Sequence, residues 1–177
     1  MHQIIFTIVE TLLSAALDAE PMEVDGEANR QKDDELKEST LAAGVESLLA
    51  SLNPAVSSGA SLAQALSQGL DVIATVSSPS SSVRRSIYTA LKQLSDRLRK
   101  NGKGEVFGAN VETRLRPLLF GPDPGTEALR LLRADAIASV VETSPPLALA
   151  FGERIRALLV DEKSVQVRDR LAAATTR

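Results

Sequence analysis

The chain has 177 residues, of which 44% are hydrophobic and 3% aromatic, and its formal net charge is −3. This length suits one compact domain or about four helical hairpins, and a core of Leu, Ala, Val and Ile is expected because Trp is absent. The absence of Cys excludes disulfides and thiolate metal sites and suits a reducing compartment, and a single histidine, His2, disfavours imidazole catalysis and zinc binding.

Residues 1–19 predict an amphipathic helix. A secretory signal is the alternative, but no Lys or Arg precedes the apolar run, Glu10 and Thr11 interrupt it, and it is too short to span a membrane. Because the helix is apolar and starts without a capping residue, we expect the chain to begin inside a larger solenoid, at the end of a preceding repeat. Its apolar residues recur at helical spacing: Ile5, Ile8, Val9, Leu12, Leu13 and Ala16.

Residues 20–38 form an acidic segment in which Pro21 and Gly26 break any helix. From Asp18 to Glu38, nine acidic residues oppose three basic ones, a net charge of −6. Few apolar residues and charge of one sign cannot offset the entropy lost on ordering, so we predict a disordered insertion. Two roles remain open for it, a solvated linker and a docking tail for a basic partner.

Residues 39–177 predict a series of helices joined by short turns. The first helix stops at Asn53-Pro54, and the second starts with Ser61 and Gln64 at capping-box spacing. The third, which has the clearest apolar face, ends at Gly102, a common left-handed terminator. Their predicted core residues are Leu41, Val45, Leu48, Leu49, Leu52, Leu62, Leu66, Leu70, Ile73, Val83, Ile87, Ala90, Leu91, Leu94 and Leu98.

Four further helices follow. The first of them is short and bent by Pro117, and the second is capped by Asp123 with Pro124 at its first position. Ser144-Pro145 begins the third, and Ser164 caps the last, which ends near residue 175. The predicted core residues of the first three are Val111, Leu115, Leu118, Leu119, Leu129, Leu132, Ala136, Val140, Leu147, Phe151, Ile155, Leu158 and Leu159.

A short pattern occurs twice, in residues 82–91 and 164–173. Its Val83-Arg84 and Val167-Arg168 pairs are 84 positions apart, twice 42. A period of 42 lies within the roughly 40–47 residues of one HEAT or armadillo helix pair, and a step of 42 from Arg84 reaches Thr126, before a third helical stretch. We therefore predict an all-α fold, an α-solenoid of antiparallel helix pairs with about seven to eight helices.

The chain resembles known repeat families at these residues. The pattern Asp161 to Arg168 and the pattern Val83-Arg84 to Leu91 resemble the second helix of a HEAT repeat. The resemblance implies that Val and Leu are interior and that Asp and Arg of adjacent repeats form a ladder. Residues 111–125 do not supply a clean first helix, and the repeat near Thr126 lacks a Val-Arg pair, so the register of the repeats stays open.

The order of segments along the chain also resembles that of a known family. An apolar helix, an acidic insertion, Ala- and Ser-rich helices and then residues 82–100 are similar to the C-terminal region of the large HEAT-repeat adaptor and scaffold proteins of the proteasome, particularly the fungal forms. That resemblance implies a cytoplasmic and nuclear scaffold that tethers or stabilises proteasome subassemblies.

The candidate site is a segment with a high net positive charge. Seven cations against Asp96 give residues 84–103 a net charge of +6. Four uses compete: a solvated helix face, a protein-docking surface, intrachain attraction to residues 20–38, and nucleic-acid binding, which the scarcity of stacking aromatics disfavours. The candidate protein-interaction face is Arg84, Arg85, Lys92, Arg97, Arg99, Lys100 and Lys103.

Catalytic, cofactor and metal sites find no support. Residues 33–35 lack the ligand spacing of a calcium loop, Gly102-Lys103-Gly104 lacks a phosphate-loop pattern, and the loop serines lack a histidine partner. We therefore expect a non-enzymatic scaffold without cofactors or a membrane span, which binds protein partners such as proteasome subunits. The alternative is a regulatory or nucleic-acid-binding helical domain that uses the basic face 84–103.

Overall fold

The computed structural model describes residues 27–75 and 79–175, with side chains from residue 36 onward. The predicted helix 1–19 and residues 20–26 of the predicted insertion lie outside the described residues. The described part contains no strand, which confirms the all-α prediction. It forms α2 (Glu27–Ser51), α3 (Gly59–Ala74), α4 (Ser81–Lys100), the 3-10 helix η1 (Gly104–Val106), α5 (Ala109–Phe120), α6 (Glu127–Thr143), α7 (Pro145–Asp161) and α8 (Val165–Thr175).

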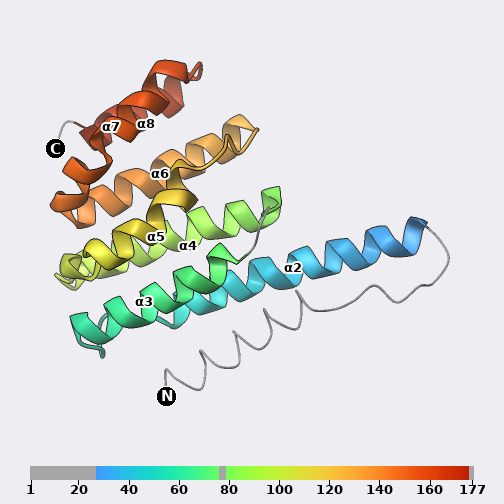
Figure 1. Ribbon diagram of the computed structural model, residues 1–177, viewed down its shortest axis with the longest axis horizontal. Helices are drawn as coiled ribbons and strands as arrows, with labels where there is room; N and C mark the ends of the chain where they lie inside the picture. Colours follow the sequence, from blue (N-terminus) through green and yellow to red (C-terminus); the bar gives the residue numbers. More distant parts are fainter. Residues whose placement is uncertain (1–26, 76–78, 176–177) are drawn as a thin grey trace.

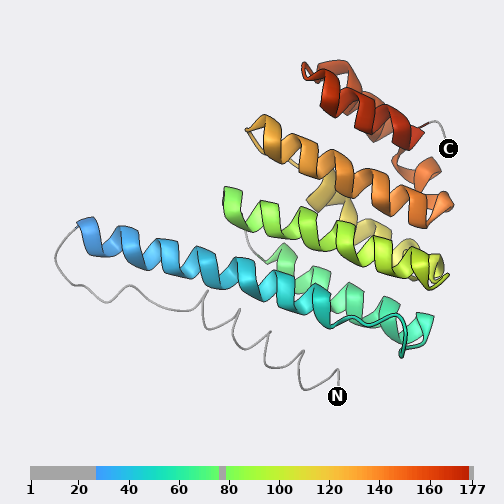
Figure 2. The ribbon, with the colours of Figure 1, turned by 180° about the vertical axis from the view of Figure 1, so that it is seen from behind.

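The helices pack in two layers (Figure 1). In one layer α2, α4, α6 and α8 lie side by side, each packed against the next, as Figure 2 shows from behind. In the other layer α3 packs on α5, and α7 packs on α6 and α8. Successive pairs α3–α4, α5–α6 and α7–α8 thus place their first helix in one layer and their second in the other, which confirms the predicted solenoid of helix pairs.

The apolar stripes of α2, α3 and α4 form the core as predicted. All their predicted core residues are buried, and Leu91 and Leu98 of α4 are 0% exposed. The prediction is less accurate beyond α4, since Leu118, Leu132, Leu158 and Leu159 are partly buried. Val165, expected to be interior, is 61% exposed because it begins α8, before the buried positions Val167, Leu171 and Ala174.

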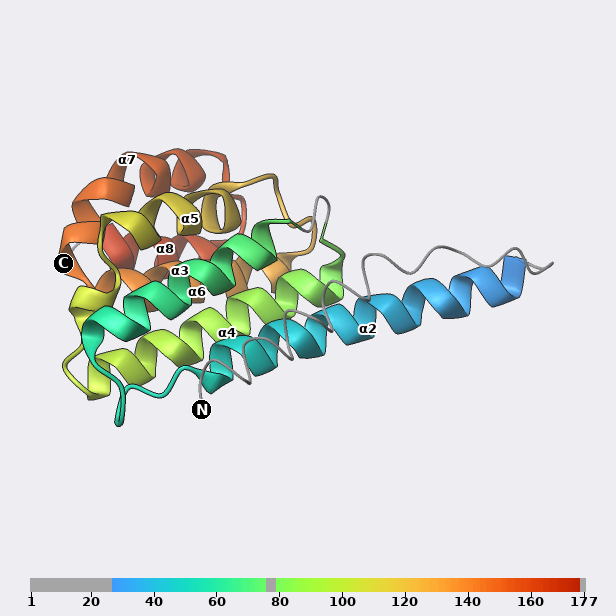
Figure 3. The same cartoon turned by 60° about the horizontal axis from the view of Figure 1, so that its bottom comes forward.

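The predicted disorder of residues 20–38 is wrong for residues 27–38, which are the N-terminal half of α2. Figure 3 shows this blue half extending beyond the other helices. Residues 39–51 are anchored by their packing on α4, so elongation toward the N-terminus needs no new nucleus. The sequence 27–38 is also rich in Glu, Lys, Ala, Gln and Arg, which favour helix strongly enough to outweigh its charge.

The end of α4 follows the prediction for Gly102. Its φ is +63°, in the left-handed region. The Lys103 N–H donates to the Leu98 carbonyl at 2.9 Å and the Gly102 N–H to the Arg99 carbonyl at 3.1 Å. This pair of bonds is a Schellman motif, which satisfies carbonyls that would otherwise be free at the helix end.

Two predicted helix starts are wrong. Helix α3 begins earlier than expected, because the hydroxyl of Ser58 accepts from the Ser61 N–H at 3.2 Å. Helix α6 begins later, capped by Thr126, while the carboxylate of Asp123 closes a turn by accepting from the Gly125 N–H at 2.9 Å. In each case another good capping residue lay near the start, and loop geometry selected it.

The remaining helix starts agree with the prediction. Ser144 precedes α7 with a proline at the first position, and the Ser164 hydroxyl accepts from the Val167 N–H at 3.4 Å.

The repeat exists, but its spacing is uneven. The capping residues of α4, α6 and α8 are Ser80, Thr126 and Ser164. The intervals between them are 46 and 38 residues, which together make the 84 seen between the Val-Arg pairs. The residues equivalent to Val83-Arg84 are therefore Leu129-Arg130. An even step of 42 missed them because the segments that contain α5 and α7 differ in length.

Candidate protein-interaction surface

Helix α4 carries most of the seven predicted cations, and the structure divides them by contact. Arg97 and Lys103 bind the end of α2 and the loop after it, Arg84 binds two loops, and Lys92 and Arg99 form ion pairs. Arg85 and Lys100 are exposed, and we find no polar side-chain partner for either in the described part of the chain. The seven residues therefore do not form one uniform basic face, and their role in binding stays a prediction.

Arg97 fastens α2 to α4. Its guanidinium donates to the carbonyl oxygens of Leu49 at 2.9 Å and Ala50 at 3.0 Å, in the last turn of α2. Helix ends leave such carbonyls without intrahelical partners, and a cation there also opposes the negative end of the helix dipole. Burial lowers the pKa of Arg97, and its Nε has no hydrogen-bond partner among the described residues. This arginine contributes to the fold.

Lys103 does the same for the loop between α2 and α3. Its ammonium group donates to the carbonyl oxygens of Pro54 and Ser57. Because both acceptors belong to the loop, the lysine holds the connection between two helices against the end of α4. The side chain is half-buried and is thus not freely available to a partner.

Polar side chains link α4 to its neighbours in the α2–α4–α6–α8 layer. Arg99 of α4 pairs with Asp96 at 3.1 Å and with Glu142 of α6. Ser86 donates to Glu46 of α2 at 2.7 Å. Exposed ion pairs such as those of Arg99 contribute about 0–1 kcal/mol each, so they add little to the stability of the layer.

Asp–Arg pairs between adjacent repeats, which the HEAT resemblance implied, are present in both layers. Asp71 of α3 pairs with Arg114 of α5 at 2.6 Å, and Asp135 of α6 pairs with Arg170 of α8 at 3.1 Å. The arginine of the repeated pattern, Arg168, is not the one that forms the pair.

The arginines of the Val-Arg pattern bind loops instead. Arg84 donates to the Pro79 carbonyl at 2.9 Å and the Asp123 carbonyl at 3.3 Å. Arg130 repeats this arrangement one pair later, donating to the Gly125 carbonyl at 2.8 Å and the Glu162 carboxylate at 3.0 Å. Each arginine thus binds the loop five residues before it and the loop that precedes the next helix of its layer.

Attraction between the cations of residues 84–103 and the acidic segment, one of the four uses considered for these cations, stays a prediction. The Ser82 hydroxyl donates to the Glu38 carboxylate at 3.4 Å, at the N-terminus of α4, where a negative charge is favoured by the helix dipole. The other acidic side chains of residues 20–35 lie outside the described side chains.

Sequence reasoning missed a second feature, the group formed by Tyr88, Arg133 and the loop after α5. Tyr88 and Arg133 are 4% and 6% exposed. Arg133 donates to the carbonyl oxygens of Gly121 and Pro122, both at 3.4 Å. Burial lowers the pKa of Arg133 and raises that of Tyr88. The sequence did contain a signal for this feature, because Arg133 is equivalent to the buried Ile87 of α4. Recognising that equivalence required the correct register of the repeats.

The described part of the chain shows neither a metal site nor a membrane-spanning helix. No three His, Asp or Glu side chains there lie together in a way that would hold a metal ion. No helix among those described is long and apolar enough to cross a membrane. His2 lies outside the described residues.

Comparison with known proteins identifies the family. No curated protein and no solved structure matches the chain. The sequence model of one family, described as ECM29, C-terminal ARM-like repeats, matches residues 1–177. The match agrees with the stacked helix pairs and with the resemblance stated from the sequence, and it makes the chain a helical-repeat scaffold. The chain belongs to the family of the C-terminal ARM-like repeats of ECM29, a proteasome adaptor.

Proposed function

We propose that this chain is part of a scaffold that tethers or stabilises proteasome particles, in the cytoplasm and nucleus, by binding protein partners without catalysis of its own. The match of the ECM29 family over residues 1–177 carries the proposal. Stacked helix pairs are suited to the role, since each pair contacts its neighbours and leaves a long, continuous surface for binding.

The candidate docking surface is the exposed side of α4. Arg85, Lys92 and Lys100 lie on it with at least part of each side chain accessible. The surface belongs to a packed helix, so its backbone needs no ordering on binding. An acidic surface on a proteasome subunit is the complement we expect, because exposed cations at an interface increase association rates and select partners by charge.

Affinity capture from native extract, followed by mass spectrometry, tests the proposal. The bait is the full chain, and we expect proteasome subunits among the captured proteins. Replacing Arg85 and Lys100 together by glutamate should lower their recovery at least about fivefold, since like charges across an interface repel. Arg97 and Lys103 are left unchanged because they stabilise the fold.

The matched control reverses two exposed cations elsewhere, Arg154 on α7 and Lys163 in the loop after it. It changes the net charge equally and should leave capture intact. Absence of proteasome subunits from the unmodified bait would contradict the tethering role. Equal recovery with both double variants would contradict the α4 surface alone.

A further inference from the structure

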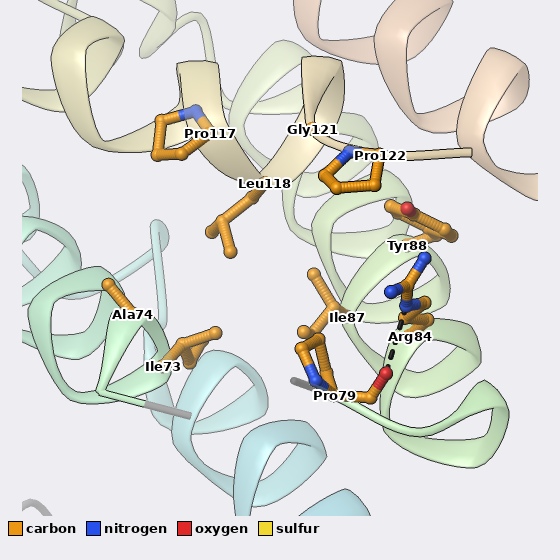
Figure 4. Close-up of a pocket in the computed structure, with 10 residues that line it drawn as sticks. All are labelled: Ile73, Ala74, Pro79, Arg84, Ile87, Tyr88, Pro117, Leu118, Gly121 and Pro122. Carbon is orange, nitrogen blue, oxygen red and sulfur yellow. Dashed lines mark hydrogen bonds between the residues drawn. The ribbon is translucent and has the colours of Figure 1, made fainter. Parts of the chain in front are cut away.

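A cavity of about 290 Å³ opens between the end of α3, the beginning of α4 and the end of α5 (Figure 4). The first two segments belong to one helix pair, α3–α4, and the third belongs to the next pair, α5–α6. The walls are largely apolar and include three prolines, whose fixed φ angles limit rearrangement. The lining residues that matter here are Ile73, Ala74, Ile87, Leu118, Arg84 and Tyr88.

The two ends of the cavity differ in chemistry. Figure 4 places Ile73 and Ala74 at one end, and Arg84 and Tyr88 at the other. Ile73 is buried and Ala74 is exposed, so Ala74 lies at the opening. A bound molecule would therefore meet hydrocarbon at one end and hydrogen-bond donors at the other.

The polar end has more positive than negative charge. Arg84 donates only to the carbonyl oxygens of Pro79 and Asp123, and it forms no ion pair within the described residues. Burial raises the pKa of Tyr88 and is the largest cause of its shift. The charges of Arg133 and Arg84 lower this pKa, and that of Asp123 raises it. The Tyr88 hydroxyl therefore stays protonated near neutral pH and can donate a hydrogen bond.

Arg133 adds an unusual charge behind this end. Arg133 is the seventh residue after Thr126, the cap of α6. The seventh residues after the caps of α4 and α8 are Ile87 and Leu171, and both are buried. Arg133 is 6% exposed, its two bonds to carbonyl oxygens are long at 3.4 Å, and no carboxylate pairs with it among the described residues. A buried cation without a counter-ion is costly, and an aliphatic residue would suit the core better.

We infer that this cavity binds a short acidic segment of a protein partner. An aliphatic side chain of the segment enters between Ile73, Ile87 and Leu118, and a carboxylate lies beside Arg84 and Tyr88, where Arg133 adds positive potential. The inference rests on the proposed scaffold function and names the chemistry of one class of partner. Charge complementarity selects this occupant, because three guanidinium groups, those of Arg84, Arg130 and Arg133, lie near two carboxylates, those of Asp123 and Glu162. The Asp123 Oδ1 is already used within its own turn, and Glu162 pairs with Arg130 at 3.0 Å.

Fluorescence anisotropy with the full chain tests the inference. The probe is a labelled octapeptide in which two leucines precede three glutamates. One control peptide has glutamine for each glutamate, and the other has serine for each leucine. We expect the probe to bind about tenfold more tightly than either control, because a charged hydrogen bond and a buried aliphatic side chain are each worth about that factor.

Two variants locate the site. Ala74→Leu fills the opening and should weaken probe binding at least about tenfold, while Ala157→Leu, at an exposed alanine of α7, should leave it unchanged. Arg133→Leu restores the aliphatic residue of the equivalent positions. It should weaken binding several-fold without lowering the urea midpoint, because removal of an unpaired buried charge does not destabilise the core.

Equal affinity for the three peptides, or full binding by Ala74→Leu, would overturn the inference. Concentration-dependent dimers that Ala74→Leu abolishes would also overturn it, because a second copy of the chain would then be the occupant. Proteasome capture is scored separately. Loss of capture with intact peptide binding would contradict the proposed function alone, and intact capture without peptide binding would contradict the cavity alone.

Discussion

Helices α4 and α8 contain the same Val-Arg pattern but differ in what surrounds them. Helix α4 packs against α2 and α6 within its layer, and Arg84 binds the loops before α4 and before α6. Helix α8 packs on α6 and α7, and Arg168 is exposed without a side-chain partner among the described residues. The pattern thus marks a position in the repeat, whereas the contacts of its arginine depend on the next helix pair.

The largest expected difference concerns the core of the two helices. Leu91 of α4 is 0% exposed and Leu171 of α8 is 3% exposed. We expect Leu91→Ala to lower the free energy of unfolding by about 3–4 kcal/mol and Leu171→Ala by about 2 kcal/mol. Helix α8 packs on two helices in the described part of the chain, whereas α4 packs on α2, α6 and η1, so the space left by the smaller side chain in α8 can collapse more easily. Urea unfolding followed by circular dichroism measures both, and equal losses would show that α8 is held as firmly as α4.

The success of the prediction for α4 has a local cause. Its apolar residues follow one helical face without interruption, and Gly102 provides the stop, so neighbours in sequence determine the element. The prediction of disorder for residues 27–38 failed because their helix depends on the packing of residues 39–51 against α4. Composition does not reveal that contact.

The candidate site was less predictable than the fold. Net charge identified a basic segment, but it could not show that Arg97 and Lys103 bind carbonyl oxygens from a different helix and loop. Arg133 was overlooked because a charged residue interrupts the apolar pattern that marks a core position. The cavity beside Tyr88 forms where α5 meets the preceding pair α3–α4, and only the register of the repeats brings α5 to that pair.

The arginines of the shared pattern should differ by a smaller amount. Arg84→Met removes donors to two carbonyl oxygens while keeping most of the aliphatic stem, and we expect a loss of about 1–2 kcal/mol in unfolding free energy. Arg168→Met should stay within about 0.5 kcal/mol. The same urea experiment measures both, and a comparable loss at Arg168 would reveal a contact of α8 that its exposed position does not suggest.

The end of α4 gives the next test. Gly102→Ala places a side chain in the left-handed region and should cost about 1 kcal/mol. Gly152→Ala is the matched control, because Gly152 lies inside α7, where an added Cβ would meet no atom within 4 Å. The control should stabilise the chain by about 0.5–1 kcal/mol, as alanine favours helix. A shift of the same sign in both melting temperatures would contradict the Schellman motif as the stop of α4.

The smallest expected effect concerns the pair that joins α8 to α6. The Arg170 Nε lies 3.1 Å from the Asp135 Oδ1, and 63% of the arginine side chain is exposed. Arg170→Gln should therefore cost no more than about 0.5 kcal/mol at low salt and nothing measurable at high salt, because the solvent screens an exposed pair. Unfolding of Arg170→Gln, Asp135→Asn and the double variant at two salt concentrations gives the coupling between the two side chains. A coupling above about 1 kcal/mol that persists in salt would mean that polar contacts, and not the buried Val167 and Leu171, hold α8 in the stack.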